Sequence, residues 1–176
     1  GKECRSLFTA PEGFVLVGVD ASGLELRCLA HYTFPFDGGE YTRQILEGDI
    51  HTANQEAAGL SNRDQAKTFI YALCYGAGDA KIGAIIGGGR AEGKAMKERF
   101  FKKMPALKKI QEGIRFRLKS QDYLTGIDGR KLRIRSDHSA LNTLLQSAGA
   151  IAMKEATCTL HRKLESHGLA LKDVMQ

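Results

Sequence analysis

The sequence predicts an α+β fold that is predominantly helical, and three observations lead to this prediction. Much of the chain repeats apolar residues at the spacing of an amphipathic helix. One apolar run, 14–19, has the composition of a buried strand, and one alternating segment, 123–135, contains the Asp128-Gly129 pair typical of a hairpin turn. The chain has 176 residues, 43% of them hydrophobic and 26% charged, which is typical of one globular domain or a part of a larger one.

The first predicted element is the strand 14–19, which is followed directly by Asp20. A carboxylate at the end of a strand is well placed to bind a metal ion. Residues 23–32 interleave leucines with charged residues, which predicts a helix packed on that strand. Ser22 or Asp20 could cap this helix, and the backbone amides of Ser22 and Gly23 would then face any phosphate near Asp20.

Residues 34–39 contain a proline and paired glycines, so we expect a loop there. Two short helices follow, 40–46 and 52–58, and His51 lies just before the second of them. A histidine seen alone is more often a capping or core residue than a ligand. The place of His51 shortly before the next helix keeps a functional interpretation open.

That next helix, 62–75, has the most informative pattern in the chain. At about 100° per residue, four polar and aromatic residues form one slowly winding row, and the apolar residues fall on another side. Two cations one turn apart can hold a polyphosphate, and the aromatic residues after them can stack on a sugar or base. A surface helix with solvated cations explains the spacing alone equally well. The row consists of Arg63, Lys67, Tyr71 and Tyr75.

Residues 79–86 predict a further helix that ends in the triple glycine 87–89. We interpret this triplet as a flexible turn, because it lacks the Lys-Ser/Thr pair of a phosphate-binding loop and follows no strand. Two helices, 91–103 and 105–121, come next. The net charge is +6, yet residues 90–119 hold eleven Lys or Arg against three Glu. Such a basic surface favours phosphate backbones as partners, although a solvated helix face is the simpler interpretation.

The last predicted elements are the hairpin within 123–135 and a long helix from 140 to about 167, which Gly168 would end. Asn142 and Gln146 lie one turn apart on this helix.

Three blocks of the sequence stand out together. They are Asp20-Ala-Ser-Gly-Leu-Glu-Leu-Arg27, then Arg63-Asp-Gln-Ala-Lys-Thr-Phe-Ile-Tyr71 with Tyr75-Gly-Ala-Gly78, and finally Asp128-Gly-Arg130 with Leu141-Asn-Thr-Leu-Leu-Gln-Ser-Ala-Gly149. In sequence and in order, the blocks resemble the conserved polymerase motifs of family A DNA polymerases, the DNA polymerase I-like family. The resemblance covers residues 14 to about 149. Ala21 and Gly23 stand where the bacterial repair enzymes usually have Tyr and Gln, so the sequence most resembles the replicative polymerases of tailed bacteriophages.

The resemblance implies a partial right-hand polymerase palm with a fingers subdomain. Residues 1–50 would form a palm segment with the first catalytic carboxylate motif. Residues 51–121 would form the fingers, with a nucleotide-binding helix at 62–75. Residues 122–176 would form a hairpin and a long helix that returns to the palm.

The resemblance also implies a role for each matching residue. Asp20 would be catalytic and would hold two Mg²⁺ ions with the Ala21 carbonyl as a further ligand, and Lys67 would be catalytic as well. Glu25 would stand against the 2′ position of the sugar, where a ribose hydroxyl would clash with it. The whole nucleotide-binding set would be Ser22, Gly23, Glu25, His51, Arg63, Lys67 and Tyr71, and the template and primer contacts would be Tyr75, Gly76, Arg130, Asn142 and Gln146.

The second metal-binding carboxylate of this family comes from a His-Asp-Glu turn on a later palm hairpin. No His-Asp-Glu occurs in this sequence. His138 follows Asp137 in the reverse order, and Asp173 lacks the partner residues. We therefore expect a fragment that is truncated before the second catalytic carboxylate motif and lacks a thumb and an exonuclease. It would bind nucleotides but would be inactive as the isolated chain.

The implied partners are primer–template DNA and deoxynucleoside triphosphates, with the missing polymerase portion or a processivity factor as further candidates. We expect no membrane partner, because no apolar run is long enough to span a membrane and no signal peptide precedes the first strand. Four widely spaced cysteines without a Cys-x-x-Cys pair indicate reduced thiols and no zinc site, and Cys28 and Cys74 sit among apolar residues. We expect a cytoplasmic protein of an infected bacterial host.

Two other functions stay open. The same surface could belong to a non-catalytic nucleotide-binding or DNA-binding module of a split polymerase. A fragment of a single-subunit RNA polymerase, whose active site is related, is the third interpretation. Glu25 disfavours it, because an RNA polymerase must admit the 2′-hydroxyl.

Overall fold

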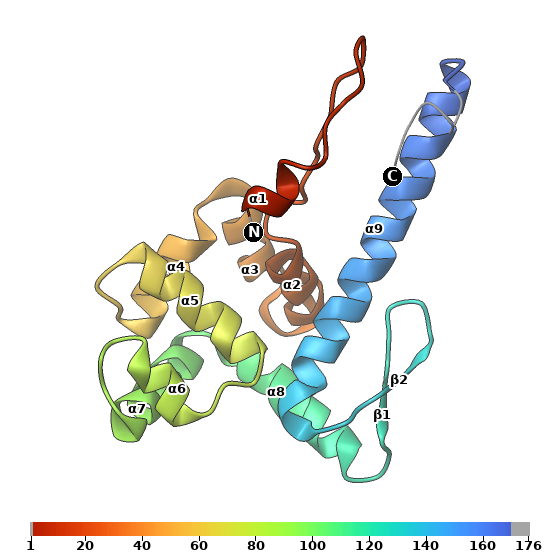
Figure 1. Cartoon of the computed structure of the whole chain (residues 1–176). Coiled ribbons are helices and arrows are strands. Elements are labelled where there is room, and N and C mark those ends of the chain that lie inside the picture. The colour runs from red at the N-terminus through yellow and green to blue at the C-terminus, as the bar shows by residue number, and fades with distance from the viewer. Residues whose placement is uncertain (1, 170–176) are drawn as a thin grey trace.

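Helices dominate the structure, a computed structural model that describes residues 2–169 (Figure 1). This confirms the predicted predominantly helical α+β fold. In chain order the elements are α1 (Lys2–Arg5), α2 (Leu24–Asp37), α3 (Glu40–Glu47), α4 (Ile50–Ala58), α5 (Arg63–Cys74), α6 (Asp79–Ala84), α7 (Arg90–Lys103), α8 (Pro105–Leu118), β1 (Tyr123–Thr125), β2 (Lys131–Arg133), the 3₁₀-helix η1 (Asp137–Ser139) and α9 (Ala140–Ser166).

One hydrophobic core joins α2, α4, α5, α7, α8 and the first half of α9. Phe69 of α5 and Phe100 of α7 are fully buried and meet edge to face, with ring centroids 5.0 Å apart. Leu26 of α2 and Leu145 of α9 are buried in the same cluster. The core also contains Cys74, whose burial raises the pKa of its thiol to about 12. This cysteine therefore packs as a small protonated apolar residue, as the sequence predicts.

The helix α5 is built as its residue pattern predicts. The Asn62 side chain caps it by accepting a hydrogen bond from the backbone N–H of Gln65 at 2.8 Å. Its apolar side, which includes Phe69 and Ile70, is buried in the core. The helix ends before Gly76, whose φ of 74° belongs to the left-handed region that favours glycine. The opposite side of α5 is left for polar residues.

The short helix α6 lies directly against α7 through two glycines. A Cβ atom on Gly83 would lie 1.8 Å from the carbonyl oxygen of Gly89, and one on Gly93 would lie 1.8 Å from the carbonyl oxygen of Asp79. Only a residue without a side chain permits such a close approach of two backbones. The triple glycine 87–89 provides the turn between the two helices, as predicted.

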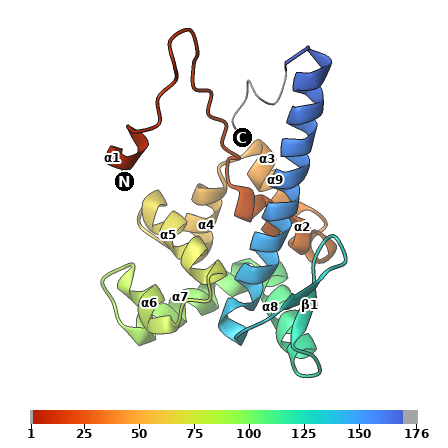
Figure 2. The same ribbon diagram turned by 45° about the vertical axis from the view of Figure 1, so that its right-hand side comes forward.

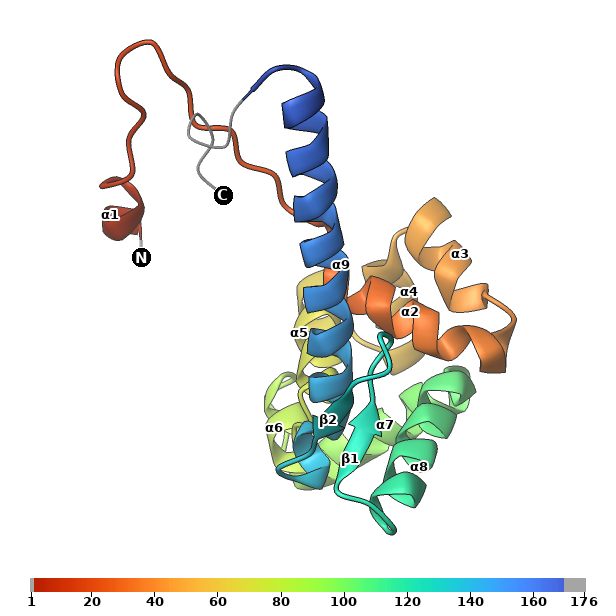
Figure 3. The ribbon, with the colours of Figure 1, turned by 90° about the vertical axis from the view of Figure 1, so that its right-hand side faces the viewer.

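The hairpin and α9 complete the structure. β1 and β2 are antiparallel, with Tyr123 opposite Arg133 and Thr125 opposite Lys131. The first half of α9 packs on α2, and its second half extends away from the other helices (Figures 2 and 3). No residue from 150 to 166 is buried.

The predicted strand 14–19 is not formed. This run has no regular secondary structure, and its large side chains are exposed, with Val17 at 82% and Val19 at 91%. A strand is stable only when another strand satisfies its backbone hydrogen bonds. Within residues 2–169 the strands that form are β1 and β2, and they pair with each other. The run 14–19 therefore has the composition of a strand but no partner strand in this range.

Two local predictions about α2 are also wrong. We expected a loop at 34–39, but α2 continues through Pro35 to Asp37 and ends at Gly38, whose N–H donates to the Phe34 carbonyl. One proline in the last turns removes a single backbone donor, which a packed helix can tolerate. The other error concerns the start of α2, where Gly23 is the N-cap and no side chain makes a capping hydrogen bond.

Candidate nucleotide-binding site

A pocket of about 710 Å³ lies between the N-terminus of α2, the turn before α4, and the polar side of α5. It is called the nucleotide pocket below, after the ligand that the sequence predicts for it. All nine residues predicted for metal binding, catalysis or nucleotide binding line it. Three separate segments of the chain therefore meet here. The nine are Asp20, Ala21, Ser22, Gly23, Glu25, His51, Arg63, Lys67 and Tyr71.

The helix α5 contributes Arg63, Lys67 and Tyr71 from successive turns. Arg63 is held by both oxygens of Asp49, with Nε 2.7 Å from Oδ2 and Nη2 3.2 Å from Oδ1. Tyr71 is half-buried, and burial followed by the charge of Glu25 raises the pKa of its hydroxyl. The hydroxyl therefore stays neutral, and the two cations give this side of the pocket its positive charge.

His51 lies in the first turn of α4, just after the N-cap residue Asp49. Its ring Nδ1 is buried and has no hydrogen-bond partner among the described residues. Burial first, and then the charge of Arg63, lowers the pKa of His51; Lys67 acts in the same direction and Asp49 opposes it. The ring is therefore neutral at pH 7 and available as a hydrogen-bonding group beside the two cations.

The segment before α2 is held by fewer contacts. Arg27 Nε donates to the backbone carbonyl of Ser22 at 2.8 Å. Gly23 begins the helix with a φ of 61°. The prediction that Ser22 or Asp20 caps α2 is wrong, because both residues precede this left-handed turn and neither side chain bonds to the first helical turn.

The fit of this segment to a metal ion rests on Asp20 and Ala21. The Asp20 carboxylate is exposed in the pocket lining, and a backbone carbonyl such as that of Ala21 is also a hard oxygen donor. Mg²⁺ is usually bound by one or two carboxylates together with waters and substrate phosphates. In the part of the chain that the structure describes, no three His, Cys, Asp or Glu side chains gather into a group that could hold a metal ion. The residues present therefore fit one side of a divalent-ion site.

A second group of predicted residues meets at the edge of this pocket. Gln146 on α9 donates from Nε2 to Glu25 Oε1 at 3.3 Å and to the Tyr75 hydroxyl at 3.2 Å. Glu25 lies at the start of α2 and Tyr75 directly follows α5. Three of the predicted contact residues are thus linked across three helices, although they are 50 to 121 positions apart in the chain.

The remaining residues predicted to contact template or primer are more dispersed. Gly76 lies so close to the backbone of His138 that an added Cβ would be 1.9 Å from its carbonyl oxygen. Asn142 is half-buried near the start of α9. Arg130 is in the hairpin turn, where its guanidinium pairs with the Asp128 carboxylate, and it lines neither pocket. Gly76 therefore lies against η1, which leads into α9, whereas Arg130 lies in the hairpin turn.

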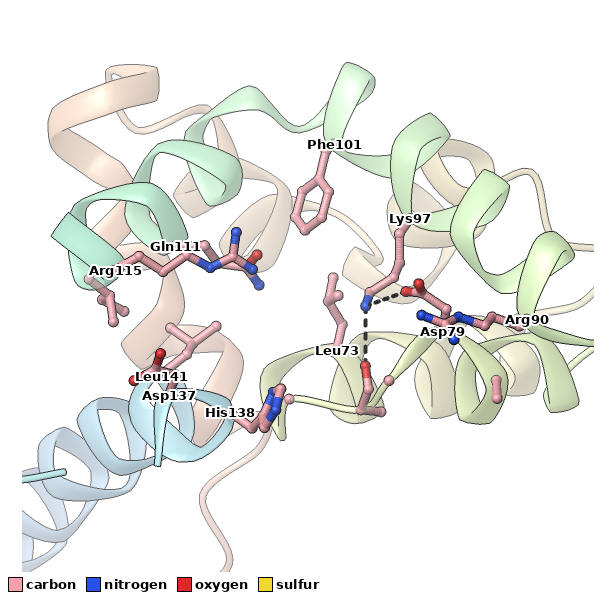
Figure 4. A pocket seen from close by; sticks show the side chains of 15 residues that line it. Leu73, Asp79, Arg90, Lys97, Phe101, Gln111, Arg115, Asp137, His138 and Leu141 are labelled. Carbon is pink, nitrogen blue, oxygen red and sulfur yellow. Dashed lines mark hydrogen bonds and ion pairs between the residues drawn. The ribbon is translucent and has the colours of Figure 1, made fainter. Parts of the chain in front are cut away.

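A second pocket, of about 570 Å³, opens at the other end of α5 (Figure 4). Basic side chains from the segment 90–119 point toward it, among them Arg90, Lys97 and Arg115. Lys97 Nζ donates to the Ala77 carbonyl at 3.2 Å and to Asp79 Oδ1 at 2.9 Å. This ties α7 to the turn after α5. The basic segment is thus partly a pocket wall and not only a solvated face.

The helical fold and the residues that line this pocket agree with the part of a right-hand polymerase that the motifs predict. Residues 1–176 match the family described as DNA polymerase family A. The chain therefore belongs to DNA polymerase family A, and the assignment made from its motifs is confirmed.

Phage enzymes are among the similar proteins, as the motifs predict. The chain is 48% identical over 176 residues to the DNA-directed DNA polymerases of Enterobacteria phage T3 and of Escherichia phage T7. Each match covers 88% of this chain and 25% of the relative, so the chain spans about a quarter of the length of these relatives.

The fold is similar to a solved structure described as the POL domain of Pol1 from M. smegmatis in complex with DNA primer-template and dNTP. The TM-score is 0.73 at 20% sequence identity, over 85% of this chain and 30% of that one. At this identity the likeness shows the fold.

Sequence reasoning missed Asp49, Arg27 and Lys97. Asp49 carried a local signal, because an Asp just ahead of a helical pattern is typical of an N-cap. Nothing in the local sequence indicated that Asp49 pairs with Arg63, fourteen positions away. The same holds for the contacts of Lys97 with Ala77 and of Arg27 with the turn before α2, since both depend on how the helices pack.

Proposed function

We propose that this chain supplies the nucleotide-binding pocket and part of the catalytic centre of a template-directed DNA polymerase. The complete enzyme would add deoxynucleotides to a primer 3′ end. The observation that carries the proposal is the composition of one cavity, which has the oxygen donors Asp20 and Ala21 and the cations Arg63 and Lys67 in its lining. Membership of DNA polymerase family A agrees with this chemistry.

In this proposal the triphosphate binds along α5. Arg63 and Lys67 hold its phosphates by charge-assisted hydrogen bonds, with Lys67 also serving the chemical step, and the neutral His51 ring adds a hydrogen bond. Tyr71 packs on the sugar. Glu25, held by Gln146, stands against the 2′ position, so a ribose hydroxyl would meet a carboxylate that is already hydrogen-bonded.

Asp20 and the Ala21 carbonyl would hold Mg²⁺ together with the phosphates of the nucleotide. A pair of divalent ions, when bound, would activate the primer 3′-hydroxyl and neutralise the leaving pyrophosphate. The backbone of Ser22 and Gly23 would lie beside the same phosphates.

Primer–template DNA would lie at the other end of α5. Tyr75 and Gly76 would contact the template base, and Arg130, Asn142 and Gln146 the primer and template near the new pair. The solved relative is described as a complex with DNA primer-template and dNTP, which supports both kinds of partner. The missing polymerase portion or a processivity factor would be a further partner, in the cytoplasm of an infected bacterium.

The division into a palm segment at 1–50, fingers at 51–121 and a returning hairpin and helix at 122–176 is part of this proposal. A competing function is a non-catalytic module that binds nucleotide or DNA as one piece of a split polymerase. The absence of a His-Asp-Glu motif from this sequence favours it for the isolated chain. Glu25 in the pocket lining disfavours the RNA polymerase alternative.

Primer extension by the purified 176-residue chain, with Mg²⁺ and deoxynucleotides, tests the proposal, and Asp20→Asn is the matched control. We expect retained nucleotide binding and no extension until a fragment with the second carboxylate is added. Failure to bind any deoxynucleoside triphosphate would remove the nucleotide pocket as a functional site. Extension by the chain alone that Asp20→Asn abolishes would show that a second carboxylate is already present.

A further inference from the structure

Asp49 is the centre of a hydrogen-bond cluster in the lining of the nucleotide pocket. Its Oδ1 accepts from the backbone N–H of His51 at 3.0 Å and from Arg63 Nη2 at 3.2 Å. Its Oδ2 accepts from the Thr52 hydroxyl at 3.0 Å and from Arg63 Nε at 2.7 Å. One carboxylate therefore joins the first turn of α4 to the first turn of α5.

This contact fixes the direction of the Arg63 side chain. A guanidinium carries five N–H donors in a rigid plane, and a bidentate pair with a carboxylate uses one edge of that plane. The donors on the other edge stay available to a ligand in the pocket that Arg63 lines. The Arg63 and Asp49 side chains are 53% and 44% exposed, so the pair adds little to folding stability. Its main effect is to hold the guanidinium of Arg63 in one orientation.

The same carboxylate also sets the position of His51. Asp49 caps α4, and the capping bond comes from the His51 backbone itself. The hydrogen bond to Arg63 holds the pKa of the Asp49 carboxyl well below its usual range, so the group is charged at neutral pH. An anion is thus built into a pocket whose proposed ligand is a polyanion.

We propose that Asp49 is a positioning residue that holds Arg63 and His51 in the arrangement that receives the terminal phosphates of the nucleotide. This inference rests on the proposed function of the nucleotide pocket. Simple electrostatics predicts the opposite effect on the Kd, because removing a negative charge beside an anion site should strengthen anion binding. The two accounts therefore predict changes of opposite sign.

Asp49→Asn is the decisive variant. Asparagine is as good an N-cap as aspartate, so α4 keeps its cap while the ion pair with Arg63 is lost. We expect the Kd of the chain for a deoxynucleoside triphosphate, measured by calorimetry in Mg²⁺ buffer, to rise about tenfold, the effect of one lost charge-assisted contact. The Kd for the deoxynucleoside monophosphate should change less than twofold. An unchanged or lower Kd for the triphosphate would overturn the inference.

Asp64→Asn is the matched control. Asp64 is an exposed carboxylate next to Arg63 in the first turn of α5, and it lies outside the pocket lining. Its loss removes a nearby negative charge without removing the bidentate contact, so the Kd should stay the same or fall. A rise equal to that of Asp49→Asn would mean that the bidentate contact with Arg63 is not the cause of the weaker binding, and would overturn the inference.

The double variant Asp49→Asn/Arg63→Ala shows whether Asp49 acts through Arg63. In the Arg63→Ala chain, the Asp49 substitution should no longer raise the Kd. An equal rise in both backgrounds would contradict the positioning role.

Lys67→Ala separates this inference from the proposed function. If the parent chain binds no triphosphate, or if Lys67→Ala binds it as well as the parent, the proposed function of the nucleotide pocket is wrong. If Lys67→Ala weakens binding and Asp49→Asn does not, this inference alone fails.

Discussion

The two walls of the nucleotide pocket are built in different ways. His51, Arg63 and Lys67, the proposed phosphate side, stand on α4 and α5, whose other faces are buried in the core. Asp20, the proposed metal side, follows the run 14–19, whose side chains are exposed and whose backbone has no strand partner in the described chain. Core packing and the hydrogen bonds of Asp49 thus hold the phosphate side in place, whereas no strand pairing within the described chain holds the segment that carries Asp20.

The largest expected difference between the two walls is in their contribution to the free energy of unfolding. Phe69→Ala removes a fully buried ring in α5 that contacts Phe100, and we expect a loss of about 3–5 kcal/mol in the free energy of unfolding. Val17→Ala, in the exposed run 14–19, should change it by less than about 0.5 kcal/mol. Urea unfolding of both variants measures the difference. A large loss for Val17→Ala would show that the run is packed in solution.

The next effect is on ligand binding. Lys67→Ala removes one cation of the phosphate side, so the Kd for a deoxynucleoside triphosphate should rise about tenfold. Asp20→Asn should leave the Kd measured in EDTA within about twofold, because the metal side acts only through a bound ion. Calorimetric titrations of the two variants provide the test. Loss of metal-free binding in Asp20→Asn would show that Asp20 contributes to nucleotide binding without a metal ion, so that the two walls do not act separately.

The smallest effect concerns pH. The pKa of His51 is lowered in the folded chain, chiefly by burial and then by Arg63, with Lys67 acting in the same direction and Asp49 opposing. Between the ordinary histidine pKa of about 6.5 and the lower folded value, the unfolded chain binds more protons. The free energy of unfolding must therefore fall as the pH drops through this window.

The His51→Gln variant should lose less stability than the parent when urea unfolding is repeated at pH 7 and at about pH 5. The exposed His31→Gln is the matched control and should follow the parent. Equal pH dependence of stability in the parent and in His51→Gln would show that the pKa of His51 is not lowered in the folded chain.

Residue pattern alone predicted the parts that depend on local periodicity. The two-sided character of α5 and the hairpin at Asp128 follow from side-chain spacing and turn chemistry, and the structure has both. The nine residues that the resemblance to family A polymerases assigned to this site also line one pocket. Their individual roles stay predictions.

Features that depend on contacts between distant segments could not be predicted in this way. The run 14–19 has the composition of a strand, but strand formation depends on a partner that composition does not reveal. Pro35 suggested a loop, but the packing of α2 carries the helix past it. The pair of Asp49 and Arg63 and the bonds of Gln146 join segments that are brought together only by folding.

The backbone contact of α6 with α7 has a consequence for the order in which the chain folds. A helix of six residues is far too short to persist by itself in water. Because Gly83 and Gly93 leave no side chains between the two helices, α6 gains its support from α7 and acquires it in one step. The two helices should therefore open and close as one cooperative unit, so that amide protons of α6 exchange with solvent only when α7 detaches.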